Sequence, residues 1–426
     1  MTSARRARIA ILSGNSLSHN PRVFKAAGAL ARAGHDVVVL GAWLDGDVKA
    51  QDRRLLQSAP FRFVPVRDGT RSGLRATAAQ LQSRARRKAA QLVHRTIGRE
   101  SPVQLGYAVA PLLAQARETA ADLSIAHSEQ GLYAARQLMR SGRRVGVDME
   151  DWFSEDLLPQ ARRARPLRLL RALEQELLTR GAYASCPSRT MSEALAAAYG
   201  CKPPAVIYNA FPLAERRAID GLRKDRRNGG IPSIFWYSQT IGPGRGLEDL
   251  AAALPLLKND IEVHLRGRAA PGTEHWLRSR LPDCRQRRVF FHPLVPNDEL
   301  MSRIAEHDIG FAGEMPYCRS RDLTVTNKML HYLLGGLAIV ASDTAGQRDV
   351  ATQAPGAVSL YASGNPPALA QAITALLDSP ERRRCARAAA LQAAERTFCW
   401  ERQEGALLER IDQALGEPVV EARRQP

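Results

Sequence analysis

The sequence predicts an α/β protein with two doubly wound, Rossmann-like domains that face a cleft, and a C-terminal helix that crosses back to the first domain. A chain of 426 residues has room for two domains of about 200 residues each. Short apolar runs alternate with helical patterns through both halves, which is typical of parallel sheets covered by helices. A stretch rich in Pro, Gly and charge separates the halves. We expect a first domain at 1–212, a linker at 213–232, a second domain at 233–396 and the crossing helix within 397–426.

The first domain opens with a strand at 8–12, a glycine-bearing loop, a helix that ends at Gly34, and a β-branched strand at 35–40. Asn20 and Pro21 suit the cap and first position of that helix. Gly14 therefore lies in a loop above a strand end, where open α/β sheets bind ligands. Further strands are expected at 61–66, 122–127, 144–149 and 183–188, and helices at 75–98, 130–140 and 164–180.

The second domain repeats this alternation and ends before an amphipathic helix at 398–415. Its strands are expected at 233–238, 261–267, 288–293, 308–313 and 338–342, and its helices at 247–257, 275–280, 297–306 and 327–336.

The charge balance is strongly positive, with 61 Lys and Arg against 43 Asp and Glu and a net charge of +18. Nucleic acid, an anionic membrane surface and an anionic substrate are the partners to weigh, beside an arginine-rich coding bias. The mixed composition argues against disorder. No apolar segment reaches the length of a membrane span or a signal peptide, and the six Cys form no CxxC pair, so we expect a cytoplasmic protein with reduced thiols.

Several catalytic signatures are absent from the sequence: there is no P-loop, no HExxH, and no GxGxxG in the first strand–helix turn. The acidic triplet 45–47 (DGD) resembles a metal-binding pattern, but it is short and we place it in a polar loop. We therefore expect no metal and no other cofactor.

Two segments of the second domain are suited to bind a diphosphate. The loop 242–246 carries Gly242, Gly244, Arg245 and Gly246, which offer close backbone approach and a forked cation. Thr326, Asn327 and Lys328 open a helix, where backbone amides and an ammonium favour anions. Each segment alone could be a turn or a cap. Together, on βα units of one domain, they predict metal-free phosphate binding.

The order of these motifs resembles GT-B glycosyltransferases of the family-4 type. SQTIGPGRGLEDL, EVHLRG and TNKMLHYLLGGLAIVASD resemble the donor-binding domain, and SGNSLSHNPRVFKAAGALARAGHDVVVLG, IAHSEQGLYAA and VGVDMEDWF resemble the acceptor domain. The resemblance implies transfer of a sugar, with retention, from a nucleotide sugar onto an acceptor. It also implies that Glu314 contacts the donor sugar. The basic stretches described below favour a glycan or lipid-linked acceptor.

The chain departs from that family at two positions. His331 stands five residues before Gly336, where a Glu normally holds the ribose, and Thr240 stands where an Arg is usual. An imidazole can still bind a hydroxyl. Arg319, Arg321 or Arg266 could replace the missing Arg, and the sequence does not choose among them.

Candidate acceptor-side residues follow two strands of the first domain. His127 ends one strand, where it is either a structural residue or a cleft residue. Asp148, Glu150 and Asp151 follow the next strand, and they form either a salt-bridged surface or a base with an orienting group. We take His127, Glu150, Asp151 and Glu314 as the catalytic candidates.

Two basic stretches lie in the first domain: 71–99, with eight Lys or Arg and no acid up to Arg99, and 162–171, with five Arg. Both carry leucines at helical spacing, which suits docking on the inner face of an anionic membrane. Solvated helix faces are the alternative. No aromatic platform accompanies the charge, so nucleic acid is not expected. A nucleotide-sugar epimerase and a non-catalytic lipid- or glycan-binding protein remain alternative functions.

Overall fold

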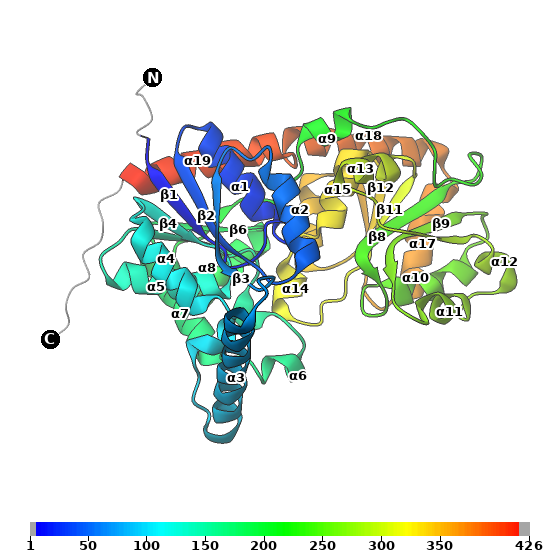
Figure 1. The fold of residues 1–426 in the computed structure, drawn as a ribbon. Coiled ribbons are helices and arrows are strands. Elements are labelled where there is room, and N and C mark those ends of the chain that lie inside the picture. The colour runs from blue at the N-terminus through cyan, green and yellow to red at the C-terminus, as the bar shows by residue number, and fades with distance from the viewer. Residues whose placement is uncertain (1–5, 417–426) are drawn as a thin grey trace. The chain divides into compact units, whose positions relative to one another are not determined.

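The structure is a computed structural model that describes residues 6–416, and it divides into two compact units. The N-terminal unit contains residues 6–187, 191–207 and 404–416. The C-terminal unit contains residues 188–190 and 208–403. Figure 1 shows a parallel sheet flanked by helices in each unit. Each unit is thus a Rossmann-like α/β domain.

The sheet of the N-terminal unit has the order β3-β2-β1-β4-β5-β6-β7, with parallel pairing throughout the described strands. The chain runs outward from β1 to β3 and then returns to place β4 on the other side of β1, so the strand order reverses between β1 and β4. The strands are β1 Arg8–Leu12, β2 Asp36–Trp43, β3 Arg62–Asp68, β4 Leu123–Ala126, β5 Val145–Asp148, β6 Tyr183–Cys186 and β7 Ala205–Val206.

Helices follow most strands of this unit, and their buried faces are rich in Ala and Leu. Asn20 caps α1 by accepting a hydrogen bond from the amide of Val23. The helices are α1 Pro21–Arg32, α2 Gly46–Leu56, α3 Leu74–Ile97, α4 Val109–Thr119, α5 Glu129–Arg140, α6 Pro159–Arg162, α7 Leu167–Arg180 and α8 Arg189–Tyr199, with short 3-10 turns at Pro102–Leu105 and Phe153–Glu155.

The expectation of a polar loop at 45–47 is wrong. Asp45 caps α2 by accepting from the amide of Val48, and Gly46 and Asp47 form the first turn of that helix. A carboxylate at the cap satisfies a helix amide and the helix dipole, which accounts for this acidic triplet without a metal.

The C-terminal unit has a parallel sheet of order β10-β9-β8-β11-β12-β13, which reverses between β8 and β11. The strands are β8 Ser233–Ile241, β9 Glu262–Ala269, β10 Val289–His292, β11 Ile309–Ala312, β12 Ala338–Ser342 and β13 Val358–Tyr361. The helices are α9 Leu213–Arg217, α10 Leu247–Ala253, α11 Thr273–Arg278, α12 Asp283–Gln286, α13 Asn297–Ala305, α14 Arg319–Leu323, α15 Asn327–Gly335, α16 Ala345–Gln353, α17 Pro366–Leu377 and α18 Pro380–Arg396, with a 3-10 turn at Leu254–Leu256.

The last helix, α19 Trp400–Gly416, buries Leu407, Ile411 and Ala414 along one face, and its Glu404 pairs with Arg32 of α1 at 2.9 Å. None of the helices described between residues 6 and 416 is long and apolar enough to cross a membrane.

Candidate functional site

The two glycine-bearing loops of the C-terminal unit meet at the point where its strand order reverses. One loop follows β8 and contains Gly246, which has a φ of +77°. A Cβ atom at this position would lie 2.6 Å from the carbonyl oxygen of Gly313, in the loop that follows β11. Only glycine permits this approach, and it places Arg245 on the loop next to the segment that carries Glu314.

The loop 242–246 is partly organised by its own side chains. Arg245 is exposed and donates to the hydroxyl of Ser238 at 2.9 Å. The amide of Gly244 donates to Glu248 at 2.6 Å, while a Cβ at Gly242 or Gly244 would meet no neighbour within 4 Å. The loop is therefore open above its backbone, with an exposed guanidinium beside it.

Glu314 and Lys328 form an ion pair across the same loops. Lys328 Nζ lies 2.5 Å from Glu314 Oε1, and both side chains are only partly buried. The backbone of Glu314 is fixed by Ser342, whose hydroxyl accepts from its amide at 2.7 Å and donates to its carbonyl at 2.8 Å. A cation and a carboxylate are thus held at one point, and each keeps part of its side chain exposed.

The helix start at Thr326 and Asn327 supplies further polar groups. Thr326 is the cap residue of α15, but its side chain makes no capping bond, and its buried Oγ1 has no hydrogen-bond partner within the described chain. Asn327 accepts from the side-chain amide of Asn209 at 2.9 Å. A helix start whose amides lack a side-chain cap is suited to bind an anion.

His331 lies one turn further along α15, and neighbours hold its ring on several sides. The ring stacks on Phe211 at a centroid distance of 3.4 Å. Tyr237 Oη lies 2.5 Å from Nδ1, and Glu215 lies 3.6 Å from Nε2. Burial, with the charges of Glu215 and Glu314, raises the pKa of Tyr237, so its hydroxyl stays protonated and can donate to Nδ1. Neither the tyrosine nor Glu215 could be paired with His331 from sequence spacing.

In the N-terminal unit, the candidate residues gather where β1, β4 and β5 end. These strands are neighbours, and the strand order reverses between β1 and β4. Gly14 follows β1 with a φ of +63°, and its carbonyl accepts from the side chain of Gln130 in α5. A Cβ at Gly14 would press within 3.3 Å of Leu112, so a larger residue would crowd this loop.

Glu150 and His127 lie together at this edge. Asn20 donates its side-chain amide to Glu150 Oε2 at 2.7 Å, and the same oxygen lies 3.9 Å from Nδ1 of His127. His127 is 1% exposed, and this Nδ1 has no hydrogen-bond partner in the described chain. The next residue, Ser128, has a φ of +129°, a strained conformation for a residue with a side chain.

Asp148 differs from Glu150, because it is sequestered. Its carboxylate accepts from Nε of Arg22 at 2.9 Å, and both side chains are only 5% exposed. Arg22 also donates to the carbonyl of Ile207. This carboxylate therefore has a structural ion-pair role, whereas Glu150 keeps 17% of its side chain exposed. Asp151 follows on the same loop and is engaged by neighbours of its own.

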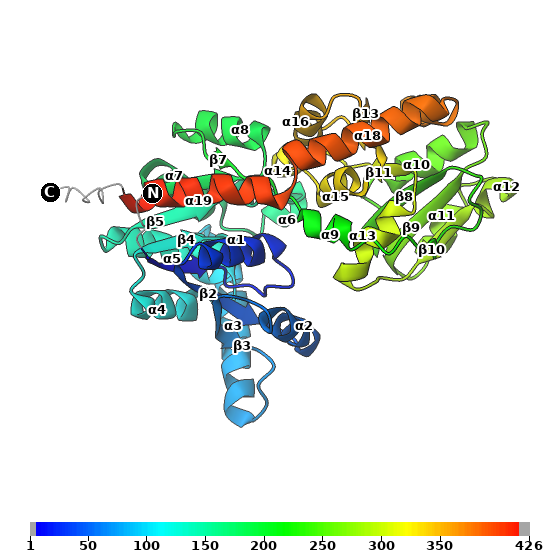
Figure 2. The same cartoon turned by 90° about the horizontal axis from the view of Figure 1, so that it is seen from above.

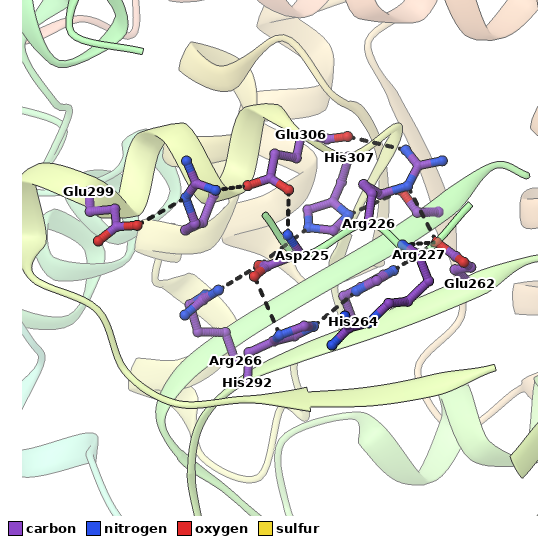
Figure 3. Close-up of polar contacts among 12 residues, drawn as sticks. Asp225, Arg226, Arg227, Glu262, His264, Arg266, His292, Glu299, Glu306 and His307 are labelled. Atoms are coloured by element: carbon purple, nitrogen blue, oxygen red, sulfur yellow. Dashed lines mark hydrogen bonds and ion pairs between the residues drawn. The ribbon is translucent and has the colours of Figure 1, made fainter. Parts of the chain in front are cut away.

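Arg266 belongs to a third group of charges, which surrounds Asp225. Figure 3 shows it beside Asp225, with His292 and His307 at the same carboxylate and His264 bonded to His292. Arg266 donates to Asp225 at 2.5 Å and to the carbonyl of Pro293, and its side chain is 3% exposed. It is therefore committed to a buried ion pair. Arg321 donates to the hydroxyl of Tyr317 at 3.2 Å, and Arg319 also has partners.

Comparisons with known proteins agree with this architecture. Residues 22–215 match the model of Glycosyltransferase Family 4, and residues 232–379 match that of Glycosyl transferases group 1. Sucrose-phosphate synthase from Thermosynechococcus elongatus superposes with a TM-score of 0.69 at 15% identity, covering 96% of this chain and 99% of its own. Anabaena HepE in complex with UDP-glucose gives 0.67 at 18% identity, covering 95% and 99%. Trehalose-6-phosphate from E. coli, bound with UDP-2-fluoro glucose, gives 0.66 at 13% identity, covering 96% and 99%. No curated protein sequence matches the chain.

Two parallel-sheet α/β domains with these structural neighbours define the GT-B architecture. The two family matches together span most of the chain. The protein belongs to the GT-B glycosyltransferases of the family-4 type, and it is a transferase.

Proposed function

We propose that the enzyme transfers a sugar from a nucleotide diphosphate sugar, bound by the C-terminal domain, to an acceptor bound by the N-terminal domain. The observation that carries this proposal is the contact between the loop after β8 and the loop after β11. This contact brings Arg245 near the Glu314–Lys328 pair and the uncapped start of α15. The complexes of Anabaena HepE with UDP-glucose and UDP favour a uridine donor.

The chemistry needs stabilisation of a departing nucleoside diphosphate. A guanidinium, an ammonium and helix amides can offset its negative charge without a metal. We infer that Arg245 and Lys328 serve this purpose, while Glu314 receives hydroxyls of the donor sugar. His331 lies one turn beyond Lys328 and is our candidate for the ribose side.

The family-4 type favours retention. In that course the bond between the anomeric carbon and the phosphate oxygen breaks, and the acceptor oxygen forms its bond on the same face. The acceptor proton then passes to the departing phosphate oxygen. Glu150 and His127, with Asp151 nearby, would orient the acceptor hydroxyl, and Gly14 would keep the neighbouring loop close. The strongly basic N-terminal domain favours a lipid-linked or cell-surface glycan precursor, met at the inner face of an anionic membrane.

The test is calorimetric binding of UDP to the full chain. Arg245→Ala and Lys328→Ala should each weaken binding about tenfold or more, because each removes a charge-assisted contact. Lys258→Ala is the matched control, because it removes an exposed cation from the same domain. Unchanged affinity in both test variants would contradict the site.

The variant Glu314→Ala distinguishes contacts to the donor sugar from contacts to the diphosphate. This variant leaves Lys328 without its carboxylate partner, so UDP binding should be retained or tighten, while turnover of UDP-glucose falls. A substrate assay by NMR also shows whether the donor is epimerised without an acceptor. Wild-type kinetics in Glu314→Ala would remove the glutamate from the mechanism.

A further inference from the structure

The long helix α3 exposes its apolar side to solvent, whereas a helix of a globular domain usually buries it. Leu74, Leu81 and Leu92 are 92%, 59% and 61% exposed. They recur at helical spacing with alanines that are also exposed, namely Ala78, Ala85 and Ala89. A helix that packs on a domain normally buries such a stripe. Figures 1 and 2 both show α3 projecting away from the sheet of its own domain.

The opposite side of α3 is polar, and it is the side that contacts the domain. Gln80 donates to the carbonyl of Gly69 at 2.9 Å, and Ser83 accepts from Arg67 at 3.2 Å. Arg87 lies over the ring of Tyr107 at 4.7 Å, and His94 lies 3.0 Å from the side-chain amide of Gln104. These contacts fix the rotation of the helix, so the leucine stripe is held outward.

Cations flank the exposed stripe on both sides. Arg84, Lys88 and Arg95 follow one border, and Arg86 lies on the other, all of them exposed. Within residues 6–416 none of these four pairs with a carboxylate, and the segment 71–99 contains no Asp or Glu. The apolar stripe therefore lies between free positive charges.

The other basic stretch, 162–171, differs from α3 because most of its arginines form ion pairs. Arg162 and Arg171 pair with Glu155, both at 2.9 Å. Arg165 pairs with Glu129, and Arg168 with Glu100 at 3.5 Å. Four of its five arginines thus have carboxylate partners within the N-terminal unit, so the stretch 162–171 offers less unpaired positive charge than α3 does.

We propose that α3 is a membrane-docking helix, which inserts the stripe of Leu74, Leu81 and Leu92 into an anionic lipid surface while its flanking cations meet the phosphates. A second copy of the chain is a poorer occupant, because two such stripes would bring like charges together along both borders. Anionic lipid satisfies both the apolar stripe and the cations.

The experiment is flotation of the full chain with vesicles of phosphatidylcholine alone or with 30% phosphatidylglycerol. The wild type should bind the anionic vesicles, and added salt should weaken that binding. R84Q/R86Q/K88Q should lower the partition about 100-fold. L81S/L92S should lower it at least tenfold, because it shortens the apolar contact.

The matched control is K202Q/K258Q/R382Q, which removes three exposed cations elsewhere with the same change in net charge. The proposal is overturned if this control loses as much binding as the α3 variant, or if the wild type does not prefer anionic vesicles. A concentration-dependent dimer that L81S/L92S dissociates would also overturn it. UDP affinity is measured in parallel, so a failed donor site and a failed docking helix are distinguishable.

Discussion

Two clusters of charge in the C-terminal domain have similar residue types and differ in how deeply they are buried. The first surrounds Asp225 on the sheet face formed by β9 and β10, and Figure 3 shows its members pointing toward one another. Asp225 is 5% exposed and meets Arg266 at 2.5 Å, His292 at 3.4 Å and His307 at 3.9 Å. The second cluster is the Glu314–Lys328 pair, which is only partly buried and lies at the open ends of the strands.

The comparison distinguishes buried charged groups that stabilise the fold from partly exposed charged groups that can contact a ligand. Around Asp225 the protein supplies most of the hydrogen-bond partners, and burial keeps the imidazoles neutral by lowering the pKa of His264 to about 2 and that of His307 to about 4. The N-terminal domain shows the same contrast, because Arg22 closes Asp148 while Glu150 stays partly open. A charged residue that keeps part of its side chain exposed in a loop beyond a strand is therefore a better functional candidate than one buried in an ion pair, even where the buried one ends a strand, as Asp148 does.

The largest expected effect is on the closed cluster. Asp225→Ala should lower the free energy of unfolding by about 3–5 kcal/mol, because Arg266 would remain buried without a carboxylate. Glu314→Ala breaks a pair that is less deeply buried, with 17% and 12% of the two side chains exposed, and should cost less, about 1–2 kcal/mol. Urea unfolding at pH 7.5 measures both. Equal losses in the two variants would mean that the clusters do not differ as described.

The next effect is the pH dependence of stability. Burial holds the pKa of His307 at about 4 and that of His264 at about 2, below the ordinary 6.5, so the unfolded chain takes up protons first as the pH falls. The free energy of unfolding should therefore be highest above pH 6.5. It should decline toward pH 4, by up to about 1.4 kcal/mol per pH unit for each histidine.

The pKa of Asp225 is also lowered, so its contribution is lost in the same direction of pH as that of the histidines, but over a lower range. Burial alone would raise the pKa of this carboxyl, but His307, Arg266 and His292 outweigh burial and hold it below its usual range. The contribution of ionised Asp225 to the free energy of unfolding therefore persists down to about pH 4 and is lost only below that pH. Urea midpoints from pH 7.5 to 4.5 provide the measurement. His307→Gln should flatten the slope, and an unchanged slope would assign the titration elsewhere.

The fold could be predicted because its signals are local. The β-branched runs at β1, β2 and β12 and the glycine stops between them determine the alternation without reference to distant residues. The loop at 242–246 and the start of a helix after Thr326 could be predicted for the same reason, while their role in binding stays a prediction. The acidic triplet at 45–47 was misplaced because a helix cap and a loop share the same residue types.

The charge partners could not be predicted, since they join residues that are distant in sequence. Asp225 and Arg266 are 41 positions apart, and Arg22 and Asp148 are 126. The two basic stretches looked alike for this reason. Only the fold shows that the acids for 162–171 come from Glu100, Glu129 and Glu155, while Arg84, Arg86, Lys88 and Arg95 of α3 pair with no carboxylate of residues 6–416.

The smallest effect tests the open carboxylate of the N-terminal domain through Asn20, whose two side-chain atoms have separate tasks. Its oxygen caps α1 through the amide of Val23 at 3.0 Å, and its nitrogen donates to Glu150 at 2.7 Å. Asn20→Ala removes both and should cost about 1 kcal/mol of stability.

Asn20→Ser restores the cap but not the donor to Glu150, so its stability should return to that of the wild type. If Glu150 orients the acceptor hydroxyl, transfer by Asn20→Ser and by Asn20→Ala should fall equally, while UDP affinity stays unchanged in both. Thermal unfolding, calorimetry and the transfer assay are compared across the two variants. Recovery of transfer together with stability in Asn20→Ser would show that Asn20 acts only as a helix cap. The proposal that Asn20 holds Glu150 in place to orient the acceptor hydroxyl would then be wrong.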